Sequence, residues 1–265
     1  MRKWVILAMG CLFIGTSDTH AQTQPPVLWE LGAEEYYYLY KEPGVMQNKG
    51  SLYGLVGSYT YRESDVMLRA EARGSVGQVD YKNSGTMDSI FDFSFEARGL
   101  AGYDIALSNV YTITPYSGFG YRYLNDDSSG ELTSTGAAGY ERESNYYYSP
   151  IGLENTFLLK EGWIVVLTTE YDHFWRGKQI SHLSDVNLGY GDVTNTQKKG
   201  YGLRGSVKVR KEGENFDLVI EPFVRYWKIA KSNDSNVTYS GVIIGYGYEP
   251  KNNTTEMGLK VSLEF

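Results

Sequence analysis

Hydrophobic and polar residues alternate along most of the chain with a period of two residues. In residues 89–103, Phe91 and Phe95 share one face, and Asp92 and Glu96 share the other. This period is typical of β-strands with one apolar and one polar face. Ten segments of about 10–15 residues follow the pattern: 27–40, 50–61, 66–77, 89–103, 110–124, 144–157, 163–176, 200–210, 216–229 and 256–265. The sequence therefore predicts an all-β protein.

The connections between these segments alternate in length. The short ones are 62–65, 104–109, 158–162 and 211–215; the long ones are 41–49, 78–88, 125–143, 177–199 and 230–255. Short turns at one end and long loops at the other are typical of a transmembrane β-barrel, with the turns in the periplasm and the loops outside the cell. We therefore predict one antiparallel, up-and-down barrel of ten strands.

One segment leaves the strand number open. Residues 242–246 (VIIGY) are too apolar for a free loop. We expect them to form a hairpin beyond the membrane, to continue the ninth or tenth strand, or to fold into the mouth as a plug. A further strand pair in the wall would give twelve strands.

Aromatic residues gather near both ends of the predicted strands, as they do at the two interfaces of a membrane. The predicted interface residues are Trp29, Tyr38, Tyr61, Tyr103, Tyr121, Tyr147, Trp163, Trp175, Tyr226 and Phe265. We also expect Tyr36, Tyr40, Tyr146, Tyr148, Phe174 and Trp227 in the outer belt. A soluble two-sheet sandwich would alternate similarly, but it would explain neither the belts nor the sorted connections.

Composition agrees with a barrel and excludes other classes. The chain has 265 residues, of which 15% are aromatic, so disorder is excluded. A formal charge of −7 without a basic cluster argues against a nucleic-acid partner. The mean hydropathy of −0.38 fits a barrel whose apolar faces point to lipid and whose polar faces point into the lumen.

The first residues are typical of an export signal. Arg2 and Lys3 precede an apolar run, and a cleavage site follows at Ala21. We predict a cleaved signal over 1–21 and a barrel domain over 22–265. The single cysteine, Cys11, lies in the signal, so we expect no disulfide in the mature protein.

The chain resembles the bacterial outer-membrane β-barrel proteins. The resemblance rests on the signal segment and on the last strand, where Val261 and Leu263 alternate toward a final Phe265. It implies an integral outer-membrane location in a Gram-negative bacterium, assembly by the barrel-assembly machinery, and contacts with outer-membrane lipids and lipopolysaccharide. The motif is generic to the class and implies little about function.

The inward-facing positions of the predicted strands carry many charges. They include Arg69, Glu71, Arg73, Glu96, Arg98, Arg122, Glu170, Asp172, Arg204, Lys208, Glu221 and Arg225, together with Lys260 and Glu264. Ten strands enclose a narrow interior, so these side chains either pair into a structural network or line a narrow pore. The alternation does not distinguish these two possibilities.

Catalytic residues are harder to find. The omptin-type proteases resemble this chain in strand number and use acidic residues with an Asp–His pair at the outer rim. Here Asp172 and His173 are adjacent, so they face opposite sides of a strand, and His173 is expected beside Trp175. His182 is expected to be a solvated loop residue near Asp185. Two further sets are candidate sites: the third-loop acids Asp126 and Asp127, and Ser149 with His173 as a Ser–His pair.

We therefore predict a non-enzymatic outer-membrane protein whose surface loops bind an unknown extracellular ligand. The loops are rich in Tyr, Ser, Gly and Asn, which make adaptable contacts. The alternative function is a narrow porin-like channel for small polar or anionic solutes. A protease or lipid-modifying enzyme at the rim is the third. We predict no catalytic site, metal or cofactor.

Overall fold

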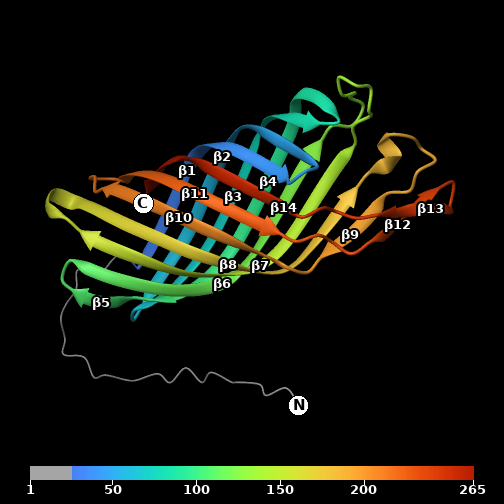
Figure 1. Cartoon of the computed structure of the whole chain (residues 1–265). Coiled ribbons are helices and arrows are strands. Elements are labelled where there is room, and N and C mark those ends of the chain that lie inside the picture. Colours follow the sequence, from blue (N-terminus) through green and yellow to red (C-terminus); the bar gives the residue numbers. More distant parts are fainter. Residues whose placement is uncertain (1–25) are drawn as a thin grey trace, which may run out of the picture.

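The computed structural model describes residues 26–265, and the predicted export signal lies outside them. Most of the described chain is β-strand (Figure 1). The strands are β1 (Val27–Glu42), β2 (Met46–Glu63), β3 (Val66–Asn83), β4 (Gly85–Tyr103), β5 (Ile105–Ser108), β6 (Tyr111–Asp127), β7 (Glu141–Leu158), β8 (Trp163–Ser181), β9 (Val193–Gln197), β10 (Gly200–Lys211), β11 (Asp217–Ile229), β12 (Ser235–Tyr239), β13 (Val242–Gly247) and β14 (Asn252–Glu264). Two short 3-10 helices, Lys160–Gly162 and Leu183–Asp185, complete the described elements. No described helix is long and apolar enough to cross a membrane.

Ten of these strands form a closed ring. Their order is β1–β2–β3–β4–β6–β7–β8–β10–β11–β14, and the ring closes where β14 pairs antiparallel with β1. Closure leaves no unpaired edge in the wall, and a β-structure surrounded by lipid needs such closure to satisfy its backbone hydrogen bonds. The prediction of a ten-stranded antiparallel barrel is confirmed.

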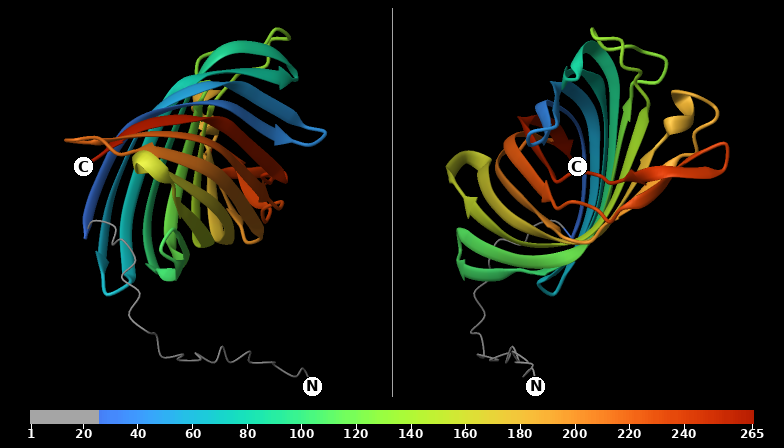
Figure 2. Two further views of the ribbon diagram at one scale, coloured as in Figure 1. Left: turned by 90° about the vertical axis from the view of Figure 1, so that its left-hand side faces the viewer. Right: turned by 45° about the vertical axis from the view of Figure 1, so that its right-hand side comes forward.

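The four remaining strands lie outside the ring. The short β5 pairs with β6 beyond the end of β4, and β9 pairs with the end of β8. The strands β12 and β13 form a separate two-stranded sheet that projects away from the barrel (Figures 1 and 2). The apolar segment 242–246 is therefore a hairpin outside the wall, and it does not raise the strand number to twelve.

The connections differ between the two ends of the barrel. At one end of the barrel, which we call the turn end, the strands are joined by short links such as 64–65 and 159–162. The start of β1 and the end of β14 also lie at this end. The other end, here the loop end, carries the links 128–140, 182–199 and 230–251.

The prediction of long connections at the loop end is wrong for two of the five. The links 41–49 and 78–88 are mostly strand, because β2 and β3 stay paired as far as Gln47 and Lys82. Strand pairing uses backbone groups, so polar sequence that breaks the alternation can still extend a ladder.

Side chains along the wall strands alternate between the lumen and the outside. In β1, Glu30 and Glu34 are buried, whereas Trp29 and Leu31 are about half exposed. The same alternation places Leu55, which is 74% exposed, on the outward face of β2. The apolar residues point out and the charges point in, which is the reverse of a soluble domain and the arrangement expected of a barrel in lipid.

Candidate functional site

All fourteen charged residues assigned to the lumen by alternation form ion pairs inside the barrel. Arg204 shows the pattern, since its guanidinium contacts Glu96, Glu170 and Asp172 from two other strands. Other pairs include Arg69–Glu71, Arg73–Glu96, Arg98–Glu170, Arg122–Glu256, Lys208–Glu30, Lys208–Glu264, Lys260–Glu221 and Arg225–Glu34. Buried charges are tolerated when they are paired and hydrogen-bonded in this way.

Two of the ion pairs cross the full width of the barrel. Arg122 on β6 contacts Glu256 on β14, and these strands lie opposite each other in the ring. Nearer the loop end, Arg142 on β7 contacts Glu42 on β1, which is again the opposite strand. The lumen is therefore bridged at two levels.

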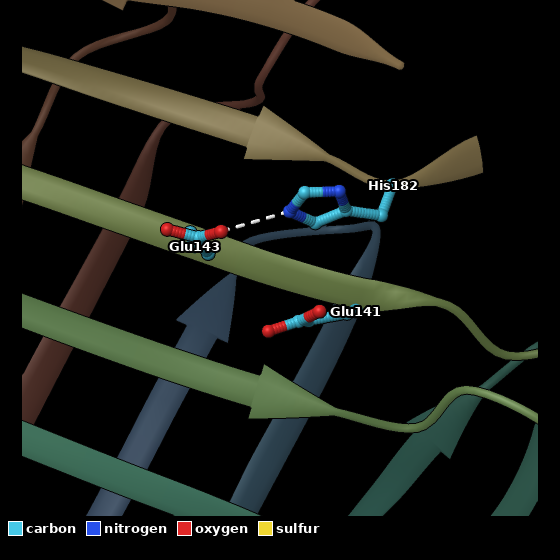
Figure 3. A group of neighbouring side chains, drawn as sticks. All are labelled: Glu141, Glu143 and His182. Atoms are coloured by element: carbon cyan, nitrogen blue, oxygen red, sulfur yellow. Dashed lines mark hydrogen bonds and ion pairs between the residues drawn. The ribbon is translucent and has the colours of Figure 1, made fainter. Parts of the chain in front are cut away.

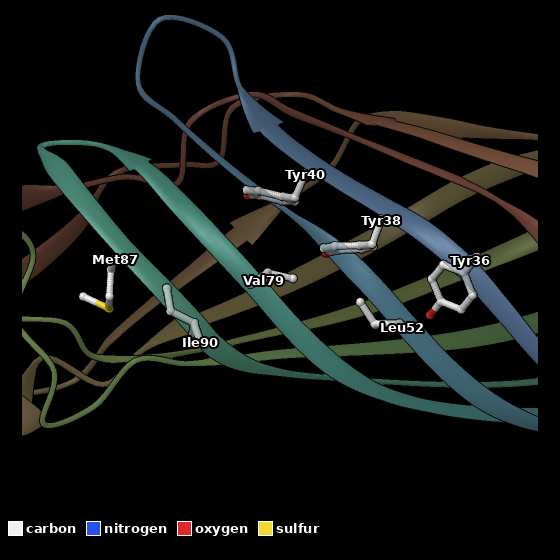
Figure 4. Packing of buried hydrophobic residues seen from close by; sticks show 7 residues of the cluster. All are labelled: Tyr36, Tyr38, Tyr40, Leu52, Val79, Met87 and Ile90. Carbon is white, nitrogen blue, oxygen red and sulfur yellow. The ribbon is translucent and has the colours of Figure 1, made fainter.

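Aromatic side chains belong to two buried clusters inside the barrel. One cluster comprises Tyr36, Tyr38, Tyr40, Leu52, Val79, Met87 and Ile90 (Figure 4). A second comprises Leu124, Tyr146, Tyr148, Phe174, Trp227 and Ile229. The guanidinium of Arg122 stacks 5.3 Å from the Trp227 ring, so the charged and aromatic groups pack together.

These clusters correct part of the predicted outer aromatic belt. Tyr38 is 3% exposed, and Tyr36 and Tyr40 are also buried. They share the strand parity of Glu30 and Glu34 and so point into the lumen. The same correction applies to Tyr146, Tyr148, Phe174 and Trp227. Runs such as Tyr36–Tyr38 place aromatic rings on both faces of a strand, so clustering near a strand end does not indicate an interface position.

The other predicted interface residues face outward. Trp29, Tyr103, Tyr147, Trp163, Trp175 and Phe265 are exposed. Tyr61, Tyr121 and Tyr226 are half-buried on outward faces, where Tyr121 and Tyr226 lie against neighbouring rings. Val261 and Leu263 also point outward beside Phe265.

A cavity with a volume of about 180 Å³ lies on the turn side of the Arg122–Glu256 pair. Arg69, Glu154, Lys208 and Arg210 are among its lining residues. A polar space of this size holds several waters. It does not continue past the bridging pairs, whose residues Arg122, Glu256 and Arg142 are absent from its lining.

Comparison with known proteins bears on this architecture. No protein-family model and no curated protein sequence matches the chain. Among solved structures, the outer membrane protease OmpT from Escherichia coli matches with a TM-score of 0.61 at 11% identity, over 92% of this chain and 99% of OmpT. The chain has the fold of the bacterial outer-membrane β-barrels. Two others match with lower TM-scores. The translocator domain of NalP from Neisseria meningitidis has a TM-score of 0.45 at 10% identity, over 90% of this chain and 89% of that one. Neisserial surface protein A has 0.36 at 12% identity, over 89% and 97%.

The rim of the barrel carries a histidine cluster that the sequence did not reveal (Figure 3). The Nε2 of His182 lies 2.8 Å from Glu143 Oε1, and its Nδ1 lies 3.1 Å from Asp192 Oδ2. Asp192 is held in turn by the backbone N–H and the hydroxyl of Ser184. His182 lies in a loop and its side chain is partly exposed, as expected, but hydrogen bonds fix its ring on both sides.

The charge state of His182 follows from these partners. Burial lowers the pKa of His182, but the hydrogen bonds to Glu143 and Asp192 outweigh burial and raise the pKa above its ordinary value. Burial acts to raise the pKa of Asp192, and the bonds from Ser184 and His182 lower it overall. A protonated His182 donates to both carboxylates and ties the segment after β8 to β7.

His182, Glu141 and Glu143 also have the donor types that hold a transition metal. Within residues 26–265, this is the one group of at least three such side chains whose ligand atoms all lie within 4.8 Å of one another. Asn125 donates to Glu141, and Glu143 already bonds to His182, so hydrogen bonds satisfy the cluster. Because Nε2 is occupied by Glu143, His182 is also poorly placed as a general base.

The other candidate pairs do not assemble. Ser149 and His173 are cross-strand neighbours, but the Ser149 hydroxyl accepts a hydrogen bond from Trp175. The His173 ring packs edge-on against Trp175 at 5.2 Å, as expected, and Asp172 points into the lumen to Arg204. Asp185 bonds to the backbone of Glu141 rather than to the imidazole of His182.

Sequence reasoning missed several ion-pair partners. Glu30, Glu34, Glu154 and Glu256 lie on the lumen side of predicted strands and pair with the predicted Arg and Lys residues. Each of them has an even residue number, like the other lumen-facing residues of its strand, and this alternation could have identified them. Arg142 lies in the predicted loop 125–143, so no alternation signal covered it.

Proposed function

We propose that this chain is a non-enzymatic surface protein of the outer membrane that binds another molecule through its loop end, on a barrel closed to solutes. The observation that carries the proposal is the pair of ion bridges, Arg122–Glu256 and Arg142–Glu42, that cross the lumen at two levels. Opening a path would separate Arg122 from Glu256 and Arg142 from Glu42, and breaking buried ion pairs is energetically expensive. The fold of OmpT and its relatives supports the outer-membrane location.

The hairpin β12–β13 is the binding surface that we favour. Val242, Ile243, Ile244 and Tyr246 are all more than half exposed. Adjacent residues of a strand face opposite sides, so both faces of the hairpin are apolar. An exposed apolar edge strand commonly takes up an extended segment of another protein by strand addition. An extracellular protein is therefore the expected partner.

The remaining surfaces have expected partners of their own. The exposed apolar side chains on the outward faces of the wall would contact outer-membrane lipids, and the loop end would contact lipopolysaccharide. Val261, Leu263 and Phe265 would be read by the barrel-assembly machinery during biogenesis.

The experiment compares cells that display wild-type protein with cells that display the Ile244→Thr, Tyr246→Thr double variant. Both are applied to an array of immobilised extracellular-matrix and serum proteins. We expect the double variant to lose binding that the wild type shows, whereas Leu132→Thr, which changes an exposed apolar residue of the β6–β7 loop, retains it. Equal binding by wild type and double variant would refute the assignment to the hairpin.

A narrow channel is the second candidate. The polar cavity of about 180 Å³ on the turn side favours it, because charged walls suit small polar solutes. In this case the bridging pairs would form a gate that opens under some condition.

A further inference from the structure

The buried carboxylates of the lumen are almost all matched by a cation. Of eleven buried Asp and Glu residues among the described residues, ten have a Lys or Arg nitrogen within 4.0 Å. The exception is Asp92, which is 2% exposed. Its cross-strand neighbour Asp126 also lacks a cationic partner within that distance. An unpaired buried charge is costly, so this pair stands out.

The two carboxylates face each other with unused oxygens. Asp92 on β4 lies directly opposite Asp126 on β6. The side chain of Asn48 reaches across from β2, and its Nδ2 donates to Asp126 Oδ2 at 2.5 Å. The Oδ1 atoms of Asp92, Asp126 and Asn48 are all buried and have no hydrogen-bond partner.

These residues line a second, small cavity near the loop end. Its volume is about 20 Å³, room for one water-sized occupant, and Tyr38 and Arg142 also line it. Arg142 is committed to Glu42 and Glu249. The guanidinium that lines this cavity is therefore paired with carboxylates other than Asp92 and Asp126.

We propose that Asp92, Asp126 and the carbonyl oxygen of Asn48 bind one divalent cation, Ca²⁺ by preference. The donors are all oxygens, which suit a hard cation, and two carboxylates balance its charge. Mg²⁺ fits less well because it requires a near-ideal octahedral shell, whereas Ca²⁺ accepts irregular arrangements of oxygen ligands. Asn48 lies near the start of β2 and Asp126 near the end of β6, so the site is near the loop end.

The first test is calorimetric titration of Ca²⁺ into the refolded barrel after EDTA treatment. We expect one saturable site in the wild type and a Ca²⁺ affinity at least about tenfold lower in Asp92→Asn. Asp234→Asn, which changes an exposed loop carboxylate, serves as the matched control and should bind as the wild type does. Absence of saturable binding in the wild type, or equal binding in Asp92→Asn, would overturn the proposal.

A second measurement separates a cation from a proton shared by the two carboxyls. In EDTA, the Asp92→Asn, Asp126→Asn double variant should unfold at a higher temperature than the wild type, and added Ca²⁺ should raise only the wild-type midpoint. A shared proton predicts no response to Ca²⁺ in either protein. If the double variant fails to fold, Asn48→Asp replaces it, because a third carboxylate should tighten Ca²⁺ binding; unchanged or weaker affinity would count against the site.

Discussion

Single residues hold this lumen together through shared partners. Arg204 bonds to Glu96 and Asp172, contacts Glu170, and lies over the ring of Tyr148. Removing one guanidinium would leave three carboxylates short of a partner. A residue that pairs with several partners links them into one network, and its removal lowers the folding stability more than the removal of an isolated pair does.

Arg204→Ala should therefore lower the free energy of unfolding by about 3–5 kcal/mol, the range for breaking a buried ion pair. Urea unfolding of the detergent-refolded barrel measures it. Lys178→Ala, at an exposed position near the loop end, is the control and should leave the unfolding curve unchanged. A loss below about 1 kcal/mol for Arg204→Ala would indicate that water replaces the guanidinium.

His182 gives the rim a dependence on pH. Because its pKa is raised in the fold, its stabilising effect is fully present below the unfolded pKa of about 6.5 and is lost as the pH rises through the higher folded value. Limited proteolysis of segment 182–199 should thus accelerate as the pH rises through that value. His182→Gln should remove this pH dependence, and the same pH profile in the variant would show that another group is responsible.

At the level of the strands, glycine and tyrosine form matched pairs between β6 and β7. Gly120 lies opposite Tyr148, and Gly152 lies opposite Tyr116. A Cβ on Gly120 would lie 2.2 Å from the Tyr148 ring, and one on Gly152 equally close to Tyr116. Each ring thus lies over a position without a side chain, which lets the tyrosines reach Glu96 and Glu170.

Gly120→Ala should displace the Tyr148 ring and cost about 1–3 kcal/mol of folding stability. The matched control is Gly99→Ala on β4, where an added Cβ meets nothing within 4 Å. Thermal unfolding of both variants, followed by near-ultraviolet circular dichroism, makes the comparison. Equal midpoints for the two variants would show that the ring moves freely.

The strands themselves were largely predictable, because a closed wall repeats one signal ten times. The alternation did not predict where a β-bulge reverses the faces to which odd- and even-numbered residues of a strand point. In β8 an extra residue near Trp175 lets both Phe174 and Gln179 point into the lumen although their numbers differ in parity. The sequence did not distinguish a hairpin from a strand extension or a plug at β12–β13, because the apolar residues there lack the alternation of the wall strands. The His182 cluster joins residues 143, 182 and 192, and only the fold brings them together.

For the whole molecule, the bridged lumen implies a barrel that does not conduct ions. In a planar bilayer the refolded wild type should show no stable conductance steps, because the Arg122–Glu256 and Arg142–Glu42 pairs block the path. Stable, voltage-tolerant steps would instead place the function in the lumen. In that case Arg122→Ala should alter the size of the steps.

The seam between β1 and β14 has a consequence for how the molecule is made. Ser262 donates a hydrogen bond to Glu30, 232 positions away in the chain, so the two ends of the chain meet in one ladder. Contacts of such long range form slowly, because the entropy of closing the chain is lost before the contact is gained. Until β14 arrives, β1 and β11 are both free edges with charged inner faces. The thirteen residues of β14 therefore convert an open sheet prone to association into a closed protein, and a chain ending before Asn252 would not form a smaller barrel.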